Sequence, residues 1–149
     1  MALYYLDTSA LVKLNIREQG TDRLLRLASR ASNHRFAVLA LAQVEFHSAI
    51  RKRERLGDID APIAAQVLGR FERHLEGKFL RQVVSDAVLD NATALVDRYP
   101  LRAYDAIQLA GCMAFRAASG GQQPVFVCAD RQLLDAAGCE GLEFLDPGE

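Results

Sequence analysis

The sequence predicts an α/β fold, a three-layer α/β/α sandwich built around a mainly parallel sheet. Short apolar runs rich in β-branched or aromatic residues alternate along the chain with stretches of helical periodicity. No tight Asn-Gly hairpin joins two such runs, so we expect consecutive strands to run parallel through helical crossovers. The 149 residues are 50% hydrophobic, which is enough for one compact domain over residues 1–149.

Five apolar runs are predicted as strands. The first covers residues 3–6 and the second residues 36–39. The clearest is Pro-Val-Phe-Val-Cys-Ala at residues 124–129, where an apolar run follows two glycines. Residues 80–84 and the weaker run at residues 142–145 complete the predicted sheet.

Helical periodicity fills the intervals between the strands. Asp60 followed by Pro62 has the form of an N-cap with proline in the first turn, and Ser85 is a second predicted cap. Gly57 and Gly138 mark helix ends. The predicted helices cover residues 9–16, 22–31, 41–56, 61–76, 86–99, 103–118 and 131–138.

Composition excludes several classes of protein. With 18 basic and 19 acidic side chains, the chain is not a polycationic nucleic-acid binder, although it could act on RNA through a local patch. No apolar run approaches the ~20 residues of a membrane helix, so we expect a soluble cytoplasmic protein. Cys112, Cys128 and Cys139 form no C-x-x-C pair and are expected to be reduced.

Two aspartates stand where an apolar strand passes into a helix. Asp7 follows the first predicted strand and Asp130 follows the strand near residues 124–129. Ligands of parallel α/β sheets bind beyond the carboxyl ends of the strands, and neighbouring strands lie about 4.8 Å apart. Each aspartate alone is also a normal helix N-cap, so the question is whether other acids converge on them.

Glu45 and Asp105 are two further acids in apolar sequence. On its predicted helix, we expect Glu45 to share a face with apolar residues, two of them four positions away, and a carboxylate on a core face needs a partner. Asp105 is the only acid of a helix that has no other charge before Arg116. A buried Glu–Arg pair and a helix-dipole role for Asp105 are the alternatives. The apolar neighbours of Glu45 are Leu41, Val44 and Ala49.

One divalent cation would satisfy all four acids together. Mg²⁺ prefers carboxylate oxygens and water, and a bound ion can activate a water nucleophile and stabilise charge on a phosphodiester. Thr8 and Ser9 place hydroxyl groups and a helix N-terminus next to Asp7. The sequence therefore predicts a metal-dependent nuclease site.

The chain also resembles the PIN-domain family, and within it the VapC-type ribonuclease toxins. The resemblance is carried in family order by Leu-Asp-Thr-Ser-Ala-Leu-Val-Lys at residues 6–13, Val-Glu at 44–45, Leu-Arg-Ala-Tyr-Asp-Ala-Ile-Gln-Leu-Ala at 101–110 and Ala-Asp-Arg-Gln-Leu-Leu at 129–134. It implies a parallel five-stranded sheet with the first strand central, and a Mg²⁺- or Mn²⁺-dependent endoribonuclease that cleaves single-stranded or structured RNA. It also implies a cognate antitoxin and a homodimer.

The resemblance places the acids on functional positions of the family. It implies that Asp7, Glu45, Asp105 and Asp130 bind the metal, with Ser9 or Thr8 at the family's hydroxyl position. Gln108 departs from the family pattern, in which His is frequent at that position.

Two other functions and one other feature stay open at this point. A phospho-accepting receiver-like signalling module also has an acidic Mg²⁺ pocket, with Asp86 as the phosphorylated residue, but Asp7-Thr8 is not its acidic pair and no Lys follows Lys78. A catalytically dead scaffold is the other. The basic run at residues 51–55 could contact RNA or an acidic antitoxin segment, or form a solvated helix end.

Overall fold

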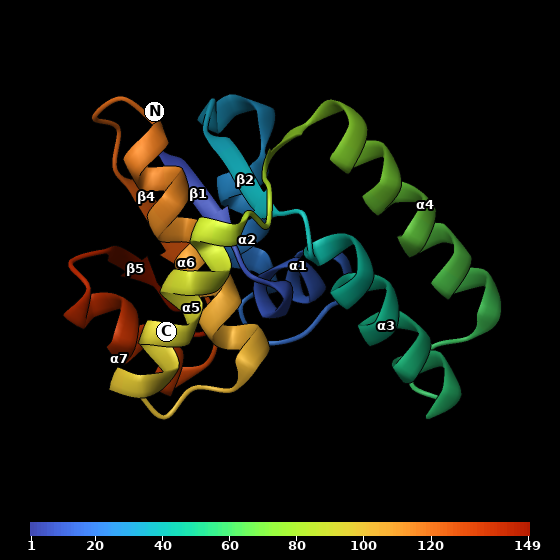
Figure 1. Ribbon diagram of the computed structural model, residues 1–149. Helices are drawn as coiled ribbons and strands as arrows, with labels where there is room; N and C mark the ends of the chain where they lie inside the picture. The colour runs from blue at the N-terminus through green and yellow to red at the C-terminus, as the bar shows by residue number, and fades with distance from the viewer.

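The computed structural model describes residues 1–149, except for the side chain of Arg30. Five strands form one sheet in the order β3-β2-β1-β4-β5, and every pair of neighbours is parallel. β1 is therefore the central strand, and the predicted parallel sheet is confirmed (Figure 1). The strands are β1 (Leu3–Leu6), β2 (Arg35–Leu39), β3 (Phe79–Gln82), β4 (Pro124–Val127) and β5 (Glu143–Leu145).

Seven α-helices and one short 3₁₀ turn, η1 (Arg30–Ser32), connect the strands. The predicted caps are in place, since Asp60 accepts a hydrogen bond from the Ile63 N–H at 2.9 Å and Ser85 accepts one from Val88 at 3.2 Å. The helices are α1 (Thr8–Asn15), α2 (Thr21–Ala28), α3 (Ala42–Arg55), α4 (Ala61–Gly77), α5 (Asp86–Arg98), α6 (Ala103–Ala118) and α7 (Arg131–Cys139).

Some predicted boundaries were wrong. α2 ends at Ala28, and the end of the predicted helix falls in the 3₁₀ turn η1, which is followed by Asn33 in the left-handed region with φ 55°. β3 begins at Phe79 and ends before Val83, whose side chain is 63% exposed. β4 ends at Val127, two residues earlier than predicted, because the chain bends before Asp130.

Each face of the sheet has its own hydrophobic core. The side chains of Leu3, Tyr5, Ala37 and Leu39 pack against α5, α6 and α7, whereas those of Leu6 and other alternate strand residues pack against α1, α2, α3 and α4. This alternation produces the three layers, and Figure 1 shows α3 and α4 side by side at one end of the molecule.

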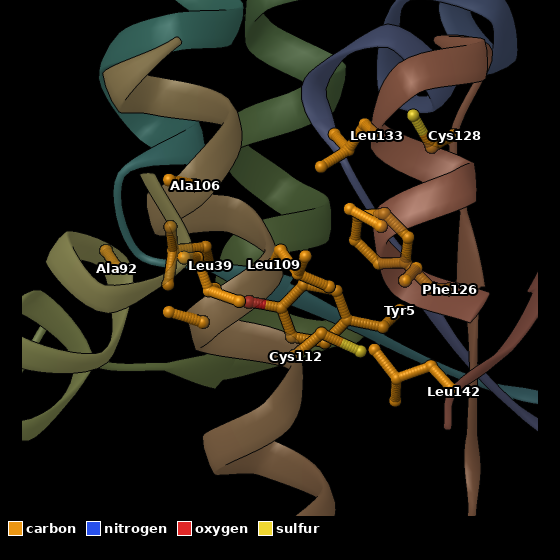
Figure 2. Close-up of a cluster of buried hydrophobic side chains, with 14 of the residues drawn as sticks. Tyr5, Leu39, Ala92, Ala106, Leu109, Cys112, Phe126, Cys128, Leu133 and Leu142 are labelled. Atoms are coloured by element: carbon orange, nitrogen blue, oxygen red, sulfur yellow. The ribbon is translucent and has the colours of Figure 1, made fainter. Parts of the chain in front are cut away.

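Tyr5 lies at the centre of the core beneath α6. Figure 2 shows its ring near Leu109, Cys112 and Phe126, with the hydroxyl oxygen beside Leu39. Gly111 allows this arrangement, since a Cβ at that position would lie 2.6 Å from both the Tyr5 hydroxyl and Leu39 Cδ1. None of the helices described by the structure is long and apolar enough to cross a membrane.

Candidate metal site at the carboxyl end of the sheet

Asp7 lies at the carboxyl end of the central strand, immediately after β1. Its side chain is 6% exposed, and it is the only buried charged side chain among those the structure describes. Oδ1 accepts hydrogen bonds from the Ala10 N–H at 2.9 Å and from the Ser9 hydroxyl at 2.7 Å, so Asp7 is the N-cap of α1. Burial, with a contribution from the negative charge of Asp105, raises its pKa to about 6.

Ser9 connects the two strand ends that carry Asp7 and Asp130. Its hydroxyl donates to Asp7 and accepts a hydrogen bond from the Ala129 N–H at 3.1 Å. β1 and β4 are neighbours, with Leu6 paired to Val127, as the prediction for these two acids required. Asp130 is half-buried and caps α7 by accepting from the Leu133 N–H at 3.1 Å.

Glu45 lies in the first turn of α3 and faces the other acids. Burial and the charge of Asp105 raise its pKa, against hydrogen bonds from Gln108 and Thr8. These bonds reach one carboxylate oxygen, Oε1, at 2.9 Å from Gln108 Nε2 and 3.2 Å from the Thr8 hydroxyl. The buried Glu–Arg pair that was the alternative is absent from the described residues.

The sequence argument for Glu45 was wrong in one respect. The buried face of α3 consists of Ala42, Phe46 and Ile50, whereas Val44, predicted to share the core face with Glu45, is 66% exposed. Glu45 therefore lies at the margin of the core face, where its carboxylate can reach both the protein interior and the open end of the sheet.

Asp105 is electrostatically coupled to the other three acids. Its charge raises the pKa of Asp7 and of Glu45, and its own pKa is raised by burial and by the charge of Asp130, while Arg102 opposes these effects. The Arg102–Asp105 ion pair is long, at 3.6 Å, and the Arg102 side chain is 86% exposed, so it offsets little of the acidic charge.

The four acids share one end of the sheet, but their side chains are not closed around a common point. Within the described residues, no group of three or more Asp, Glu, His or Cys side chains is placed to hold a metal ion as these side chains stand. One carboxylate oxygen of Asp7 and one of Asp130 instead accept the backbone N–H groups of their N-caps. The four-ligand metal site therefore stays a prediction.

The donor set nevertheless fits a hard divalent cation. Four carboxylates with a single exposed arginine leave an excess of negative charge, and oxygen ligands are those that Mg²⁺ and Mn²⁺ prefer. A buried acceptor without a partner, Oε1 of Gln108, lies beside them. A bound cation would therefore complete groups that the protein leaves unsatisfied.

Sequence reasoning missed two polar contributors to this end of the sheet. Gln108 was noted only as a departure from a family pattern, yet it connects α6 to α3 and α1 through Glu45 and Thr8. Cys128 is buried, and its sulfur accepts a hydrogen bond from the Asp130 N–H at 3.2 Å. The signal available for Gln108 was its place one turn after Asp105 on an apolar helix.

Three further features remain to be placed: Asp86, the basic run at residues 51–55, and an open pocket near the tip of β1. Asp86 is exposed in the first turn of α5, after its cap Ser85. Within the basic run, Arg53 pairs with Glu18 at 2.8 Å and Arg51 with Glu54 at 2.8 Å. An open pocket extends from the tip of β1 along α1 and α3, and its lining includes Thr8, Ser9, Ala129, Lys13, Lys52 and Arg53.

Comparisons with known proteins agree with this architecture. The family model described as PIN domain matches residues 4–137. Ribonuclease VapC35 of Mycobacterium tuberculosis is 33% identical over 147 residues, covering 99% of this chain and 98% of the relative. The matched region contains all four candidate acids.

Solved structures with low sequence identity share the fold. A toxin-antitoxin complex from Klebsiella pneumoniae aligns with a TM-score of 0.66 at 19% identity, covering 97% of both chains. VapBC2 from Rickettsia felis, bound to a DNA fragment from its promoter, aligns with a TM-score of 0.64 at 13% identity, covering 96% of this chain and 97% of that one. With the family model matching most of the chain, the protein belongs to the PIN-domain family.

Proposed function

We propose that this protein is a Mg²⁺- or Mn²⁺-dependent endoribonuclease, the toxin of a type II toxin-antitoxin pair. The observation that carries the proposal is the state of Asp7, a buried carboxylate that has no basic partner among the described residues and whose pKa is raised by burial. A carboxylate in this setting calls for a cation. The 33% identity to Ribonuclease VapC35 over nearly the whole chain supports RNA as the substrate class.

In this proposal Asp7, Glu45, Asp105 and Asp130 hold the ion. A bound divalent cation would supply a more acidic water and offset the negative charge that develops on the phosphodiester. Ser9 orients Asp7 through its 2.7 Å hydrogen bond, and Thr8 orients Glu45. These contacts keep the ligand oxygens in place before substrate arrives, which lowers the reorganisation needed for reaction.

In the same proposal, the pocket beside Thr8 and Ser9 binds the sugar-phosphate backbone of a single RNA strand. Lys13, Lys52 and Arg53 are lining residues, and contacts of this kind give sequence-independent affinity for phosphate. Its lining also contains the acids Glu18 and Asp58, and Glu18 pairs with both Lys13 and Arg53, so Lys52 is the lining cation without an ion pair among the described residues. The structural neighbours described as toxin-antitoxin complexes support a cognate antitoxin as partner. We further propose one PIN domain over residues 1–149 that acts on cytoplasmic RNA as a homodimer.

The direct test incubates the purified protein with single-stranded RNA and Mg²⁺ and maps the product ends. We expect cleavage that is lost in EDTA, restored by Mg²⁺ or Mn²⁺, and absent in Asp7→Asn at the same concentration of folded protein. In cells, we expect growth arrest on expression of the wild type alone and recovery when the neighbouring small open reading frame is co-expressed. Cleavage by Asp7→Asn at the wild-type rate would refute the site.

The receiver-like alternative makes a different prediction. Incubation with acetyl phosphate and Mg²⁺ would phosphorylate a receiver on an aspartate, with Asp86 as the candidate. Membership of the PIN-domain family does not favour this function, and Asp86 is exposed on α5. We expect no covalent phosphate by intact-mass measurement, and phosphorylated Asp86 would overturn the nuclease proposal.

A further inference from the structure

Gln108 uses only one half of its side-chain amide. The residue lies on α6 one turn after Asp105, and its side chain is 3% exposed. Its Nε2 donates to Glu45 Oε1 at 2.9 Å and is 3.3 Å from the Thr8 hydroxyl. Its Oε1 is closed off from solvent and has no hydrogen-bond partner among the described residues.

The contact with Glu45 determines which side of the Gln108 amide carries the nitrogen and which the oxygen. Rotating the amide by half a turn would place its carbonyl oxygen where Nε2 now lies, 2.9 Å from a carboxylate oxygen. Two acceptors at that distance without a shared proton repel each other. Oε1 therefore has to face away from the oxygen that Nε2 contacts, and no described residue donates to it there.

A buried carbonyl oxygen without a donor is costly. It loses its hydration without gaining a hydrogen bond, and native proteins keep such a group only when an ion, a water or a function accounts for it. Another unpartnered group, the hydroxyl of Tyr5, lies in the core packed against α6, the helix of Gln108, and a buried water joining the two groups is the alternative explanation. That arrangement would be structural and would have no connection with a cation.

The hydrogen bonds around Glu45 favour a role at the metal site. Gln108 and Thr8 both contact Oε1 of Glu45, and no described residue donates to its Oε2. One oxygen of Glu45 is thus held by the protein and the other is available to a ligand. Gln108 achieves this without adding a charge to four acids that already repel one another.

We propose that Gln108 is a positioning residue of the metal site. Its Nε2 holds Glu45 in the orientation that a cation requires, and its Oε1 accepts a hydrogen bond from a water bound to that cation. The inference rests on the proposed function, because it requires a cation among the four carboxylates. Mg²⁺ and similar ions keep several waters, and a cation-polarised water is a strong donor to a buried amide oxygen.

The test measures Mn²⁺ binding to the metal-free full-length protein, from the electron paramagnetic resonance signal of free Mn²⁺ at constant pH. Gln108→Met replaces the amide by an apolar side chain of similar length, and we expect its Kd for Mn²⁺ to be about 10-fold or more weaker than wild type. The matched control is Tyr5→Phe, which removes the other unpartnered group. We expect its Kd to equal that of the wild type.

Each result has a defined meaning. Wild-type protein that binds no Mn²⁺ refutes the proposed function and this inference together, whereas equal affinities of wild type and Gln108→Met refute only the inference. An equal loss of Mn²⁺ affinity in Tyr5→Phe also overturns the inference, because the Tyr5 hydroxyl and Gln108 Oε1 would then be partners of each other. Urea unfolding in EDTA checks that Gln108→Met is folded.

A second variant decides the question if Gln108→Met does not fold. Gln108→Asn keeps the amide but is one methylene shorter, so it cannot span the same distance to Glu45. We expect a similar loss of Mn²⁺ affinity in Gln108→Asn. Wild-type affinity in this variant would overturn the inference.

Discussion

Asp7 and Asp130 occupy equivalent local positions, yet the protein treats them differently. Each follows a parallel strand, and each accepts a hydrogen bond from the backbone N–H three residues later, that of Ala10 or Leu133. Asp7, however, is enclosed at the end of the central strand and is 6% exposed, whereas Asp130 is half-buried on a bend beyond the end of β4. Their difference comes from the tertiary surroundings.

The comparison separates two roles of an aspartate at a strand end. Capping is local and requires only one oxygen and a helix that begins at the next residue. Desolvation depends on the elements that cover the site, and it raises the pKa of Asp7 to about 6. A buried capping carboxylate therefore stabilises the helix through one oxygen, while its negative charge is disfavoured by burial until a cation binds to it.

The largest expected difference between the two aspartates is in RNA cleavage. Asp7→Asn should lower the rate by about 10³-fold or more, since charge stabilisation of several kcal/mol is lost with a central ligand. Asp130→Asn should lower the rate by about 10–100-fold, because water can replace a partly exposed ligand more easily. Single-turnover cleavage of one RNA in Mg²⁺ measures both rates. Equal losses would mean that the burial of a carboxylate does not determine how much it contributes to the cleavage rate.

The second difference concerns stability without metal. The pKa of Asp7 rises from 3.8 to about 6 on folding, so the folded protein binds this proton more tightly than the unfolded chain. Its contribution to the free energy of unfolding therefore falls as pH rises from about 4 to about 6, by up to roughly 3 kcal/mol, and stays constant above that.

Asp7→Asn removes this titration while keeping an oxygen for the cap. In EDTA at pH 8 we expect the variant to be more stable than wild type by about 1–3 kcal/mol, with the difference vanishing near pH 4. Urea unfolding at the two pH values measures it, and Asp130→Asn is the control. A difference independent of pH would show that Asp7 is not the group that titrates.

The third test compares two glycines, Gly111 on α6 and Gly138 on α7, the helices that begin near Asp105 and Asp130. Gly111→Ala on α6 would force a Cβ to 2.6 Å from the Tyr5 hydroxyl and Leu39, so we expect a loss of about 1–3 kcal/mol. At Gly138 on α7 the nearest atom would be Phe144 Cε1 at 3.1 Å, on a 43% exposed side chain that can move. Urea unfolding should show a change within about 1 kcal/mol for Gly138→Ala, and a similar loss in both would contradict the unequal packing.

The smallest expected effect isolates the cap of α7. Asp130→Ala removes the acceptor for the Leu133 N–H and should cost about 1 kcal/mol, whereas Asp130→Asn keeps an acceptor and should stay within about 0.5 kcal/mol of wild type. Both are measured by urea unfolding in EDTA. A loss in Asp130→Asn as large as in Asp130→Ala would mean that the carboxylate charge, and not the cap, stabilises the helix.

The elements with strong local signals could be predicted from sequence. Asp60 with Pro62 and Ser85 mark helix starts whose chemistry is contained in a few residues, and the apolar runs indicate the strands. β3 covers Phe79–Gln82 and not residues 80–84, because it is an edge strand, where exposed and buried apolar side chains give the same sequence pattern. Such a boundary depends on pairing with β2, which lies far away in sequence.

The site was predictable as a set of residue types but not as a geometry. The acids stood out because each interrupts apolar sequence, but Val44 was wrongly assigned to the face of Glu45, since adjacent residues of a helix point about 100° apart. The contact between Gln108 and Glu45 spans 63 positions, and neither residue carries a local signal of the other. Periodicity gives the face of a helix, whereas the partner across the interface depends on how the helices dock.

The position of β1 in the sheet has a consequence for how the protein folds. Leu3 is paired on one side with Arg35 and on the other with Pro124, so the first strand made is completed only by one of the last. Long-range parallel pairing of this kind is slow, because loop-closure entropy is lost before the contact is gained. During synthesis Asp7 and Glu45 are made long before Asp130, so the set of four acids at this end of the sheet is complete only after residue 130 has been translated.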